Sequence, residues 1–318
     1  MAVSAVALAA TVAAGSAGAA GYPSQPIRII IPFAPGGGAD LPGRLLAEKL
    51  SQAWGQSVVV ENRPGATGSI AESFVARSAP DGYTVLLATP SSHTIGPHLL
   101  KNISFDPLED LRGVTLFGWV PNVLVVNPSV PAGNLQELIA LAKQKPGALN
   151  YSSSGQGSSV QVTTETFAQQ AGITLTHIPY NGVTPAVTAV ISGQVQMMFA
   201  PAALALPQIK AGKLRQMTPL VDTAKIDADW SRTPSQTVAQ RNAANWLGFV
   251  MPARTPENVV RTWQDALATI MQSQDVREKF AEWTIIPADT SGAPFDAIIK
   301  KEYQESGAML KRLDIDPS

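Results

Sequence analysis

The hydrophobic positions along the chain form short apolar runs that alternate with stretches of helical spacing. Ile27–Ile31 is an isoleucine-rich run between two prolines, which is typical of a strand buried on both faces. Ala39–Trp54 follows, with leucines spaced along one helical face. Ser57–Val60 and Tyr83–Ala88 are further strand-like runs, and Thr67–Arg77 between them has helical character. This βαβαβ order predicts a parallel sheet with right-handed crossovers.

A second α/β set begins near Asn122. Its expected strands lie at 123–126, 174–178, 196–199 and 214–220, and its expected helices at 135–143, 158–170, 184–191 and 201–211. The chain ends in expected helices at 257–271, 275–283 and 295–313. Two segments cross between the sets, at 119–122 and at 245–249, and the second follows a polar stretch, 222–245, expected to form a long loop with a short helix. Two α/β lobes joined by two crossings enclose a cleft with a hinge, a shape that suits ligand capture by closure.

The N-terminal segment has the pattern of an export signal. No charged side chain precedes Arg28, Ala5–Ala14 is a short apolar run, and Ala-Gly-Ala at 17–19 matches a small-x-small cleavage site. The run is shorter than the ~20 residues that span a bilayer. We therefore predict a cleavable signal peptide at residues 1–19 and a soluble mature protein in the periplasm. The usual basic start is missing, so an Ala/Gly-rich tail is the alternative.

The composition narrows the class of protein. Hydrophobic residues make up 45% and charged residues 15% of the 318 residues, which allows a large core. The formal net charge of −1 provides no basic face, so we expect no nucleic-acid partner. The chain has no cysteine, which excludes disulfides, thiolate metal sites and a cysteine nucleophile. We expect no cofactor and no metal site, because the histidines do not have metal-ligand spacing.

Residues 32–40, Pro-Phe-Ala-Pro-Gly-Gly-Gly-Ala-Asp, are the strongest local feature and are named the glycine loop. They follow a predicted buried strand and open a helix. Glycines let the backbone approach a ligand closely, and the helix N-terminus offers N–H groups to an anion such as a carboxylate or phosphate. A dinucleotide site is one alternative, since Gly36 and Gly38 fit that pattern and Glu61 could serve as its acidic residue, but Leu41 departs from it. A tight turn without a ligand is the other.

A second loop, Tyr151–Ser159, is named the serine loop, and it lies in the other half of the chain between a strand and a helix. Its hydroxyls and glycine N–H groups could hold an anion from the opposite side of the cleft. Tyr180 and Asn181 end another expected strand and offer polar groups to the same ligand. The simpler alternatives are a serine N-cap and an ordinary turn.

Catalytic patterns are few. The chain contains no nucleophile elbow, no phosphate-binding P-loop and no H-E-x-x-H zinc motif. The remaining enzyme hypothesis is a secreted hydrolase or lyase that uses His177 with Ser154. It requires these two side chains to lie within hydrogen-bond reach in the cleft. We expect no enzymatic activity.

Several strings together resemble one known family, the Bug, or TctC-type, extracytoplasmic solute receptors of tripartite tricarboxylate transporters. The matching strings, in chain order, lie at 22–28, 31–40, 60–66, 79–84, 121–128, 177–182, 209–215 and 246–248. The resemblance implies a type II periplasmic-binding-protein fold, a two-lobed α/β Venus flytrap with two hinge crossings. With the crossings above, it places the first lobe at 20–120 and 246–318 and the second at 121–245.

The resemblance also implies closure around a small carboxylate, held largely by backbone N–H groups and water. The implied ligand-binding positions are Phe33, Ala34, Gly38, Ala39, Asp40, Ser91, Ser92, His93, Ser154, Ser158, Ser159 and Tyr180, with Ala200 as a further position. The implied partners are the membrane subunits of a tripartite tricarboxylate-type transporter or a sensor kinase, and we expect a monomer.

Two positions depart from the family pattern. Ala200 stands where members often carry an aspartate that suits an ammonium group, so we predict a ligand without an amine. Ala39 stands where a threonine or serine is frequent, so its backbone N–H must serve in place of a hydroxyl. Trp119 could line the cleft, although packing at the hinge is the simpler expectation.

Overall fold

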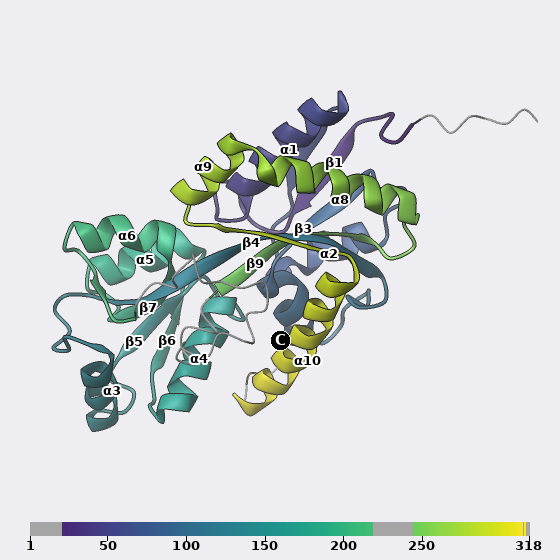
Figure 1. Cartoon of the computed structure of the whole chain (residues 1–318). Coiled ribbons are helices and arrows are strands. Elements are labelled where there is room, and N and C mark those ends of the chain that lie inside the picture. The colour runs from purple at the N-terminus through teal and green to yellow at the C-terminus, as the bar shows by residue number, and fades with distance from the viewer. Residues whose placement is uncertain (1–20, 219–243, 314, 316–318) are drawn as a thin grey trace, which may run out of the picture.

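The computed structural model describes residues 21–218, 244–313 and 315. The predicted signal peptide and most of the polar stretch 222–245 lie outside these residues. The strands follow the order β2-β1-β3-β9-β4-β7-β5-β6, with β10 and β8 also paired to β4. Two α/β lobes share this sheet (Figure 1), as the hydrophobic pattern predicts.

The first lobe is built on the predicted parallel strands. These are β1 (Ile27–Ile31), β2 (Val58–Asn62) and β3 (Thr84–Ala88), with Ile29 opposite both Val60 and Val85. All four isoleucines of β1 are fully buried, while Arg28 is exposed at the start of the strand. Helices cover both faces, so the strand is apolar on both sides.

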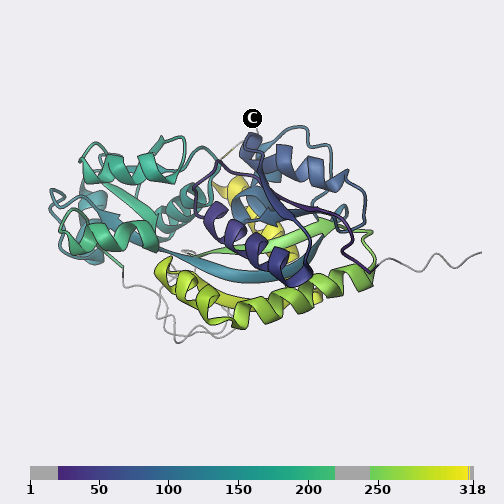
Figure 2. The same ribbon diagram turned by 90° about the horizontal axis from the view of Figure 1, so that it is seen from above.

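Four helices form most of the two layers that cover the sheet. They are α1 (Asp40–Trp54), α2 (Ser69–Ala76), α8 (Glu257–Gln272) and α10 (Ala293–Arg312). Leu46 of α1 and Trp263 of α8 belong to one core cluster, and Val75 of α2 and Phe295 of α10 belong to another. Figure 2 shows α1 and α8 together on one side of the sheet. A further helix, α9 (Gln274–Glu282), continues the α8 layer.

The two crossings are parts of long strands, whereas the sequence predicted only short crossing segments at 119–122 and 245–249. β4 (Leu111–Val126) and β9 (Ala244–Pro252) pair antiparallel, with Trp119 opposite Trp246 and Val120 opposite Asn245. β4 joins β9 and β10 (Ile286–Ser291) in the first lobe and β7 and β8 in the second. The hinge is therefore a hydrogen-bonded ribbon that runs through both lobes. The exact lobe boundaries at 120/121 and 245/246 stay a prediction.

The second lobe repeats the α/β pattern. Its strands are β5 (Asn150–Ser153), β6 (Thr176–Pro179), β7 (Met197–Pro201) and β8 (Arg215–Gln216). Its helices are α3 (Leu135–Gln144), α4 (Ser159–Ala171), α5 (Val183–Ile191) and α6 (Ala202–Lys210). They enclose a separate apolar core around Val125, Met198 and Phe199. Among the described helices, none combines the length and apolar character needed to cross a membrane.

Candidate functional site

Asp40 fixes the shape of the glycine loop. Its carboxylate accepts hydrogen bonds from the Gly36 N–H (2.8 Å), the Arg44 Nε (2.9 Å) and the Asn62 Nδ2 (2.8 Å). Burial opposes ionisation of this carboxyl, but these three hydrogen bonds outweigh it and lower the pKa of Asp40. Asn62 also donates to the Phe33 carbonyl at 3.0 Å. The side chain of Asp40, only 2% exposed, is therefore a support of the loop.

The loop keeps backbone donors for a ligand. The N–H groups of Asp40 and Leu41 donate to the Gly37 carbonyl, which closes the start of α1. Within the described part of the chain, no protein acceptor is hydrogen-bonded to the N–H of Gly38 or of Ala39. Gly38 is exposed, and a Cβ added there would meet no atom within 4 Å. Free N–H groups at a helix N-terminus attract an anion.

The predicted residues Ser91, Ser92 and His93 lie on η2 (Pro90–Ile95), a turn of π-helix after β3. Ser91 is partly exposed, whereas Ser92 and His93 are buried within the first lobe. The His93 Nδ1 lies 3.1 Å from the Glu72 Oε2, and the Ser92 hydroxyl caps the turn at Thr89. Of these three residues, Ser91 is the one that is partly exposed. The buried side chains of Ser92 and His93 hold the turn through their hydrogen bonds.

The serine loop meets η2 directly. The Ser159 N–H, the first of α4, donates to the Ser91 Oγ at 3.0 Å. Ser158 is the N-cap of α4 and accepts from the Gln161 N–H at 3.3 Å. Ser154 is partly exposed beside them. The structure thus brings Ser91 of the first lobe to Ser158 and Ser159 at the start of α4.

His177 supports the serine loop from inside the second lobe. Its Nε2 lies 2.6 Å from the Ser153 Oγ, and its ring stacks on Tyr151 with centroids 4.8 Å apart. Burial lowers the pKa of His177 to about 4, so the ring is neutral at pH 7. The hydrolase hypothesis required a bond to Ser154, but the partner is Ser153, which is fully buried and closed to a substrate.

The remaining predicted positions are close to this region or behind it. Tyr180 is partly buried, and its N–H donates to the Ser153 carbonyl at 3.1 Å. Ala200 is fully buried on β7 opposite Val123. Phe33 is partly buried, and Ala34 is exposed on the glycine loop. Trp119 packs partly buried against the first-lobe core at the crossing, as expected for a hinge residue.

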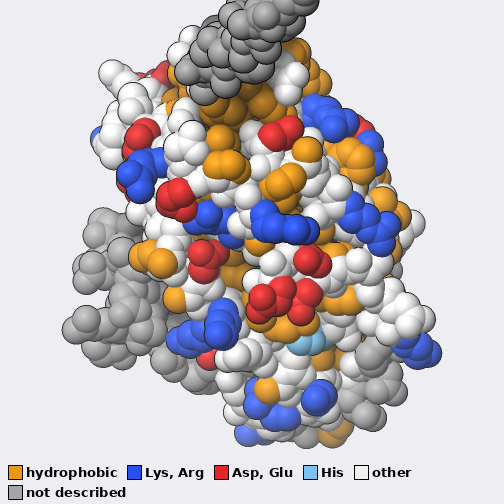
Figure 3. All heavy atoms as spheres, turned by 90° about the vertical axis from the view of Figure 1, so that its right-hand side faces the viewer, with side chains coloured by type: hydrophobic (Ala, Val, Ile, Leu, Met, Phe, Trp, Pro, Cys, Tyr) orange, Lys and Arg blue, Asp and Glu red, His pale blue; other side chains and the backbone are white. Residues whose placement is uncertain are grey.

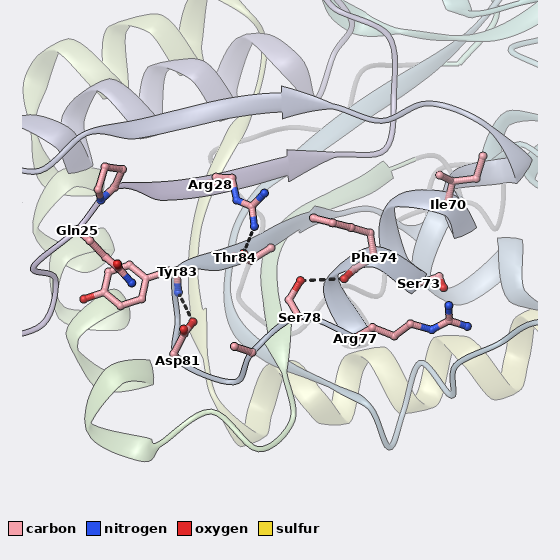
Figure 4. A pocket seen from close by; sticks show the side chains of 12 residues that line it. Gln25, Arg28, Ile70, Ser73, Phe74, Arg77, Ser78, Asp81, Tyr83 and Thr84 are labelled. Atoms are coloured by element: carbon pink, nitrogen blue, oxygen red, sulfur yellow. Dashed lines mark hydrogen bonds between the residues drawn. The ribbon is translucent and has the colours of Figure 1, made fainter.

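A separate hollow of about 710 Å³ opens at the other end of the first-lobe sheet. Figure 4 shows Arg28, Phe74, Arg77 and Thr84 on its wall, with the Arg28 guanidinium bonded to the Thr84 hydroxyl. Arg28 and Thr84 begin their strands, whereas the glycine loop and η2 follow strand ends, so this hollow is not the predicted cleft. Basic and acidic side chains are interspersed on the face seen in Figure 3. That face has no continuous basic surface of the kind that binds nucleic acid.

Sequence reasoning missed several supporting residues. Asn62 and Glu72 hold the glycine loop and η2 through side-chain hydrogen bonds. Ser153, one of the hydroxyls of the serine loop, supports that loop by bonding to His177. Asn62 does stand within one of the family-like strings, at 60–66, which was the available signal. No sequence signal pointed to Glu72, because it lies on a helix 21 residues before its partner His93.

Comparison with known proteins agrees with this architecture. A family model described as "Tripartite tricarboxylate transporter family receptor" matches residues 43–315. The chain is 34% identical to Protein BugT of Bordetella pertussis over 303 residues, covering 91% of this chain and 92% of BugT.

Solved structures agree as well. A structure described as a periplasmic transporter superposes with a TM-score of 0.79 at 35% identity and covers 93% of this chain and 99% of its own. The R. palustris protein Rpa4515 with adipate superposes with a TM-score of 0.78 at 30% identity, covering 93% and 100%. Matched over most of its length in both sequence and fold, the chain belongs to the tripartite tricarboxylate transporter receptor family of periplasmic solute-binding proteins.

Proposed function

We propose that the protein captures a small carboxylate without an amine between its lobes and delivers it to a tripartite tricarboxylate-type membrane transporter. The observation that carries this proposal is the 3.0 Å hydrogen bond from the Ser159 N–H to the Ser91 Oγ. It joins the helix start of one lobe to a loop of the other, so a ligand near this point would touch both.

The donors at this point suit a carboxylate. Among the described residues, the N–H groups of Gly38 and Ala39 have no protein acceptor, and the start of α4 meets the first lobe at Ser91. Helix N-termini stabilise an anion without a paired cation. The relative Rpa4515, 30% identical, is described with adipate, a dicarboxylate, which supports the same ligand class.

The capture mechanism follows from the two-lobed shape. In the open form both loops are solvated, and the carboxylate docks first on the glycine loop. A second polar group then meets the serine loop, and this contact, made only when the lobes approach, favours the closed form. Bending is expected where the paired strands β4 and β9 cross, near Val120 and Asn245.

The absence of an amine is argued from Ala200. This position has no carboxylate, so the second lobe lacks the partner that an ammonium group would need there. A ligand whose polar groups are carboxylates or hydroxyls fits the neutral N–H and hydroxyl donors on both loops.

Family membership supports the proposed location and the proposed partner. The proposed mature protein starts near residue 20 and works in the periplasm, where closure presents a surface to the membrane subunits. A ligand-sensing role that feeds a membrane sensor kinase is the second candidate, because it needs the same closure.

The test is a thermal-shift screen of residues 20–318 against mono-, di- and tricarboxylates, aromatic acids, amino acids and nucleotides. A ligand that binds only the folded state raises the melting temperature. We expect amine-free carboxylates to do so. A response to amino acids alone would contradict the Ala200 argument, and a response to nucleotides alone would overturn the proposal.

The variant Ala39→Pro sharpens the screen. It removes the N–H of Ala39, the N-cap of α1, which has no protein acceptor among the described residues, and we expect it to lose most of the carboxylate response. Ala39→Ser keeps the N–H and is the matched control. Equal responses of the two variants would show that the glycine loop does not hold the carboxylate.

A further inference from the structure

The turn that carries Ser91 rests on a set of buried polar groups that the proposed capture does not use. Glu302 of α10 accepts a hydrogen bond from the Trp246 Nε1 at 2.5 Å and lies 3.5 Å from the Thr94 Oγ1. Thr94 belongs to η2, and Trp246 belongs to the crossing strand β9. One carboxylate therefore touches both η2, the turn that carries Ser91, and the crossing strand β9.

A second contact ties the same two elements. His93 of η2 presents its ring edge-on to the indole of Trp246, with centroids 6.4 Å apart. Its Nδ1 is held by the Glu72 Oε2 at 3.1 Å, and both side chains are at most 1% exposed. π-Helical turns are rare and occur mostly at functional sites, so a turn of this kind needs such support.

The helix that carries Glu302 also reaches the second lobe. The Thr166 Oγ1 of α4 donates to the sulfur of Met309, and Leu310 packs with Leu99 and Val162 across the lobes. α10 thus contacts η2, the crossing strand β9 and helix α4, whose first N–H donates to Ser91. A group on α10 can couple the three.

We propose that Glu302 is a positioning residue for ligand capture: it holds η2 against β9 so that Ser91 meets the start of α4. This inference rests on the proposed function, because capture needs the loops of both lobes in register. Glu302 lies on α10, which packs against η2, and its hydrogen-bond partners among the described residues are Trp246 and Thr94, so it acts through them.

The decisive variant is Glu302→Leu, which keeps the volume and removes the acceptor. A merely structural residue would lower stability and ligand affinity together. Here we expect affinity for adipate to fall about ten-fold, the size of one lost hydrogen bond to a charged group. The melting temperature at pH 8 should change little, because removal of a partly buried carboxylate offsets the loss of the acceptor for the Trp246 N–H. Glu302→Gln keeps an acceptor and should retain the affinity.

A readout without ligand separates this inference from the proposed function. Exchange of the Ser159 amide reports its hydrogen bond to Ser91, so it should be faster in Glu302→Leu than in the wild-type protein. It should be unchanged in Glu302→Gln and in the control Glu305→Gln, an exposed carboxylate on the same helix. If adipate fails to bind the wild-type protein, the proposed ligand class is in doubt, but the exchange still decides the positioning role.

Trp246→Phe provides an independent variant. It removes the indole donor while keeping an aromatic ring in the core, and it should accelerate Ser159 exchange as Glu302→Leu does. Unaltered exchange at Ser159 in both folded variants would overturn the inference. If Glu302→Leu does not fold, Trp246→Phe alone gives the answer.

Discussion

At the scale of single residues, the polar side chains near the cleft mostly support backbone groups. Asp40 and Asn62 shape the glycine loop, and Ser153 with His177 shapes the serine loop. Among the described residues, the groups that remain for a ligand are the N–H groups of Gly38 and Ala39 and the partly exposed serines Ser91 and Ser154. Asp40 and Glu72 are buried carboxylates in such supporting positions.

Asp40→Asn should loosen the glycine loop. It removes the charge that three donors share, so we expect a loss of about 1–3 kcal/mol in the free energy of unfolding, as for other hydrogen bonds to buried charged groups. Urea denaturation measures this loss. The exposed Asp265→Asn on α8 should change stability little, and an equally small effect at Asp40 would contradict the support role.

Glu302 should make stability depend on pH. Burial raises the pKa of its carboxyl from the ordinary 4.5 to about 7. The hydrogen bonds from Trp246 and Thr94 and the charge of Lys301 lower this pKa in part, and the charge of Glu305 raises it. The folded state then holds this proton more tightly than the unfolded state. The contribution of Glu302 to the free energy of unfolding is therefore complete below pH 4.5 and is lost as the pH rises to about 7.

Glu302→Gln removes that titration. We compare the free energy of unfolding of Glu302→Gln with that of the wild-type protein at two pH values. The variant's advantage over the wild-type protein should be larger at pH 8 than at pH 4.5 by about 1–3 kcal/mol. His177, whose pKa is lowered to about 4, titrates in both proteins and cancels from the difference. A wild-type-minus-variant difference that is flat with pH would contradict this prediction.

At the scale of elements, the two lobes meet where the serine loop touches the segment after η2. Gly157 has a φ of +71°, and the Cδ1 of Leu99 occupies the place that a Cβ would take there. Ile95, Leu99, Val162 and Leu310 form an apolar cluster from elements of both lobes. Close approach at this glycine therefore determines how tightly the lobes can pack.

Gly157→Ala should push the lobes apart. Its matched control is Gly172→Ala, since Gly172 has a similar φ of +61° but no atom within 4 Å of an added Cβ. Both changes strain the backbone by ~1 kcal/mol, and only the first displaces Leu99. We expect Gly157→Ala alone to raise the radius of gyration in small-angle X-ray scattering and to weaken carboxylate binding. The same radius for both variants would rule out the lobe-separating contact.

At the scale of the whole molecule, the paired strands β4 and β9 make one structure of two lobes. β4 pairs with first-lobe and second-lobe strands along its 16 residues, so neither lobe has a complete sheet without it. Hinge bending must therefore twist a hydrogen-bonded ribbon. Each lobe nevertheless encloses its own core, so the lobes can move as units.

The shared sheet predicts cooperative unfolding. Loss of β4 from either lobe removes strand pairing from both, so we expect a single transition in denaturant. Tryptophan fluorescence of a Trp230→Phe variant follows the first lobe, where Trp54, Trp119, Trp246, Trp263 and Trp283 lie, and far-UV circular dichroism follows the whole chain. The two curves should coincide. Two separated midpoints would mean that the lobes unfold independently.

Local pattern predicted much of this fold. The isoleucine run of β1 and the leucine face of α1 appear where expected, because burial requires apolar residues at those spacings. Strand β10 and the first half of β4 were missed. β10 reads Ile-Pro-Ala-Asp-Thr-Ser, and its strand form depends on pairing with β4 and not on its own residues. The expected strand 214–220 is reduced to Arg215–Gln216 within the described residues.

By itself, the sequence determined the α/β class, the family and the two loops, because hydrophobic period, glycine and proline placement and long motifs are local properties of the chain. Tertiary structure alone decided which side chains face the cleft. The turn of η2 buries His93 against Glu72 and leaves Ser91 outside, and the pairing of β5 with β6 joins His177 to Ser153 and not to Ser154. Such choices depend on which distant elements pack together, and no local pattern records that.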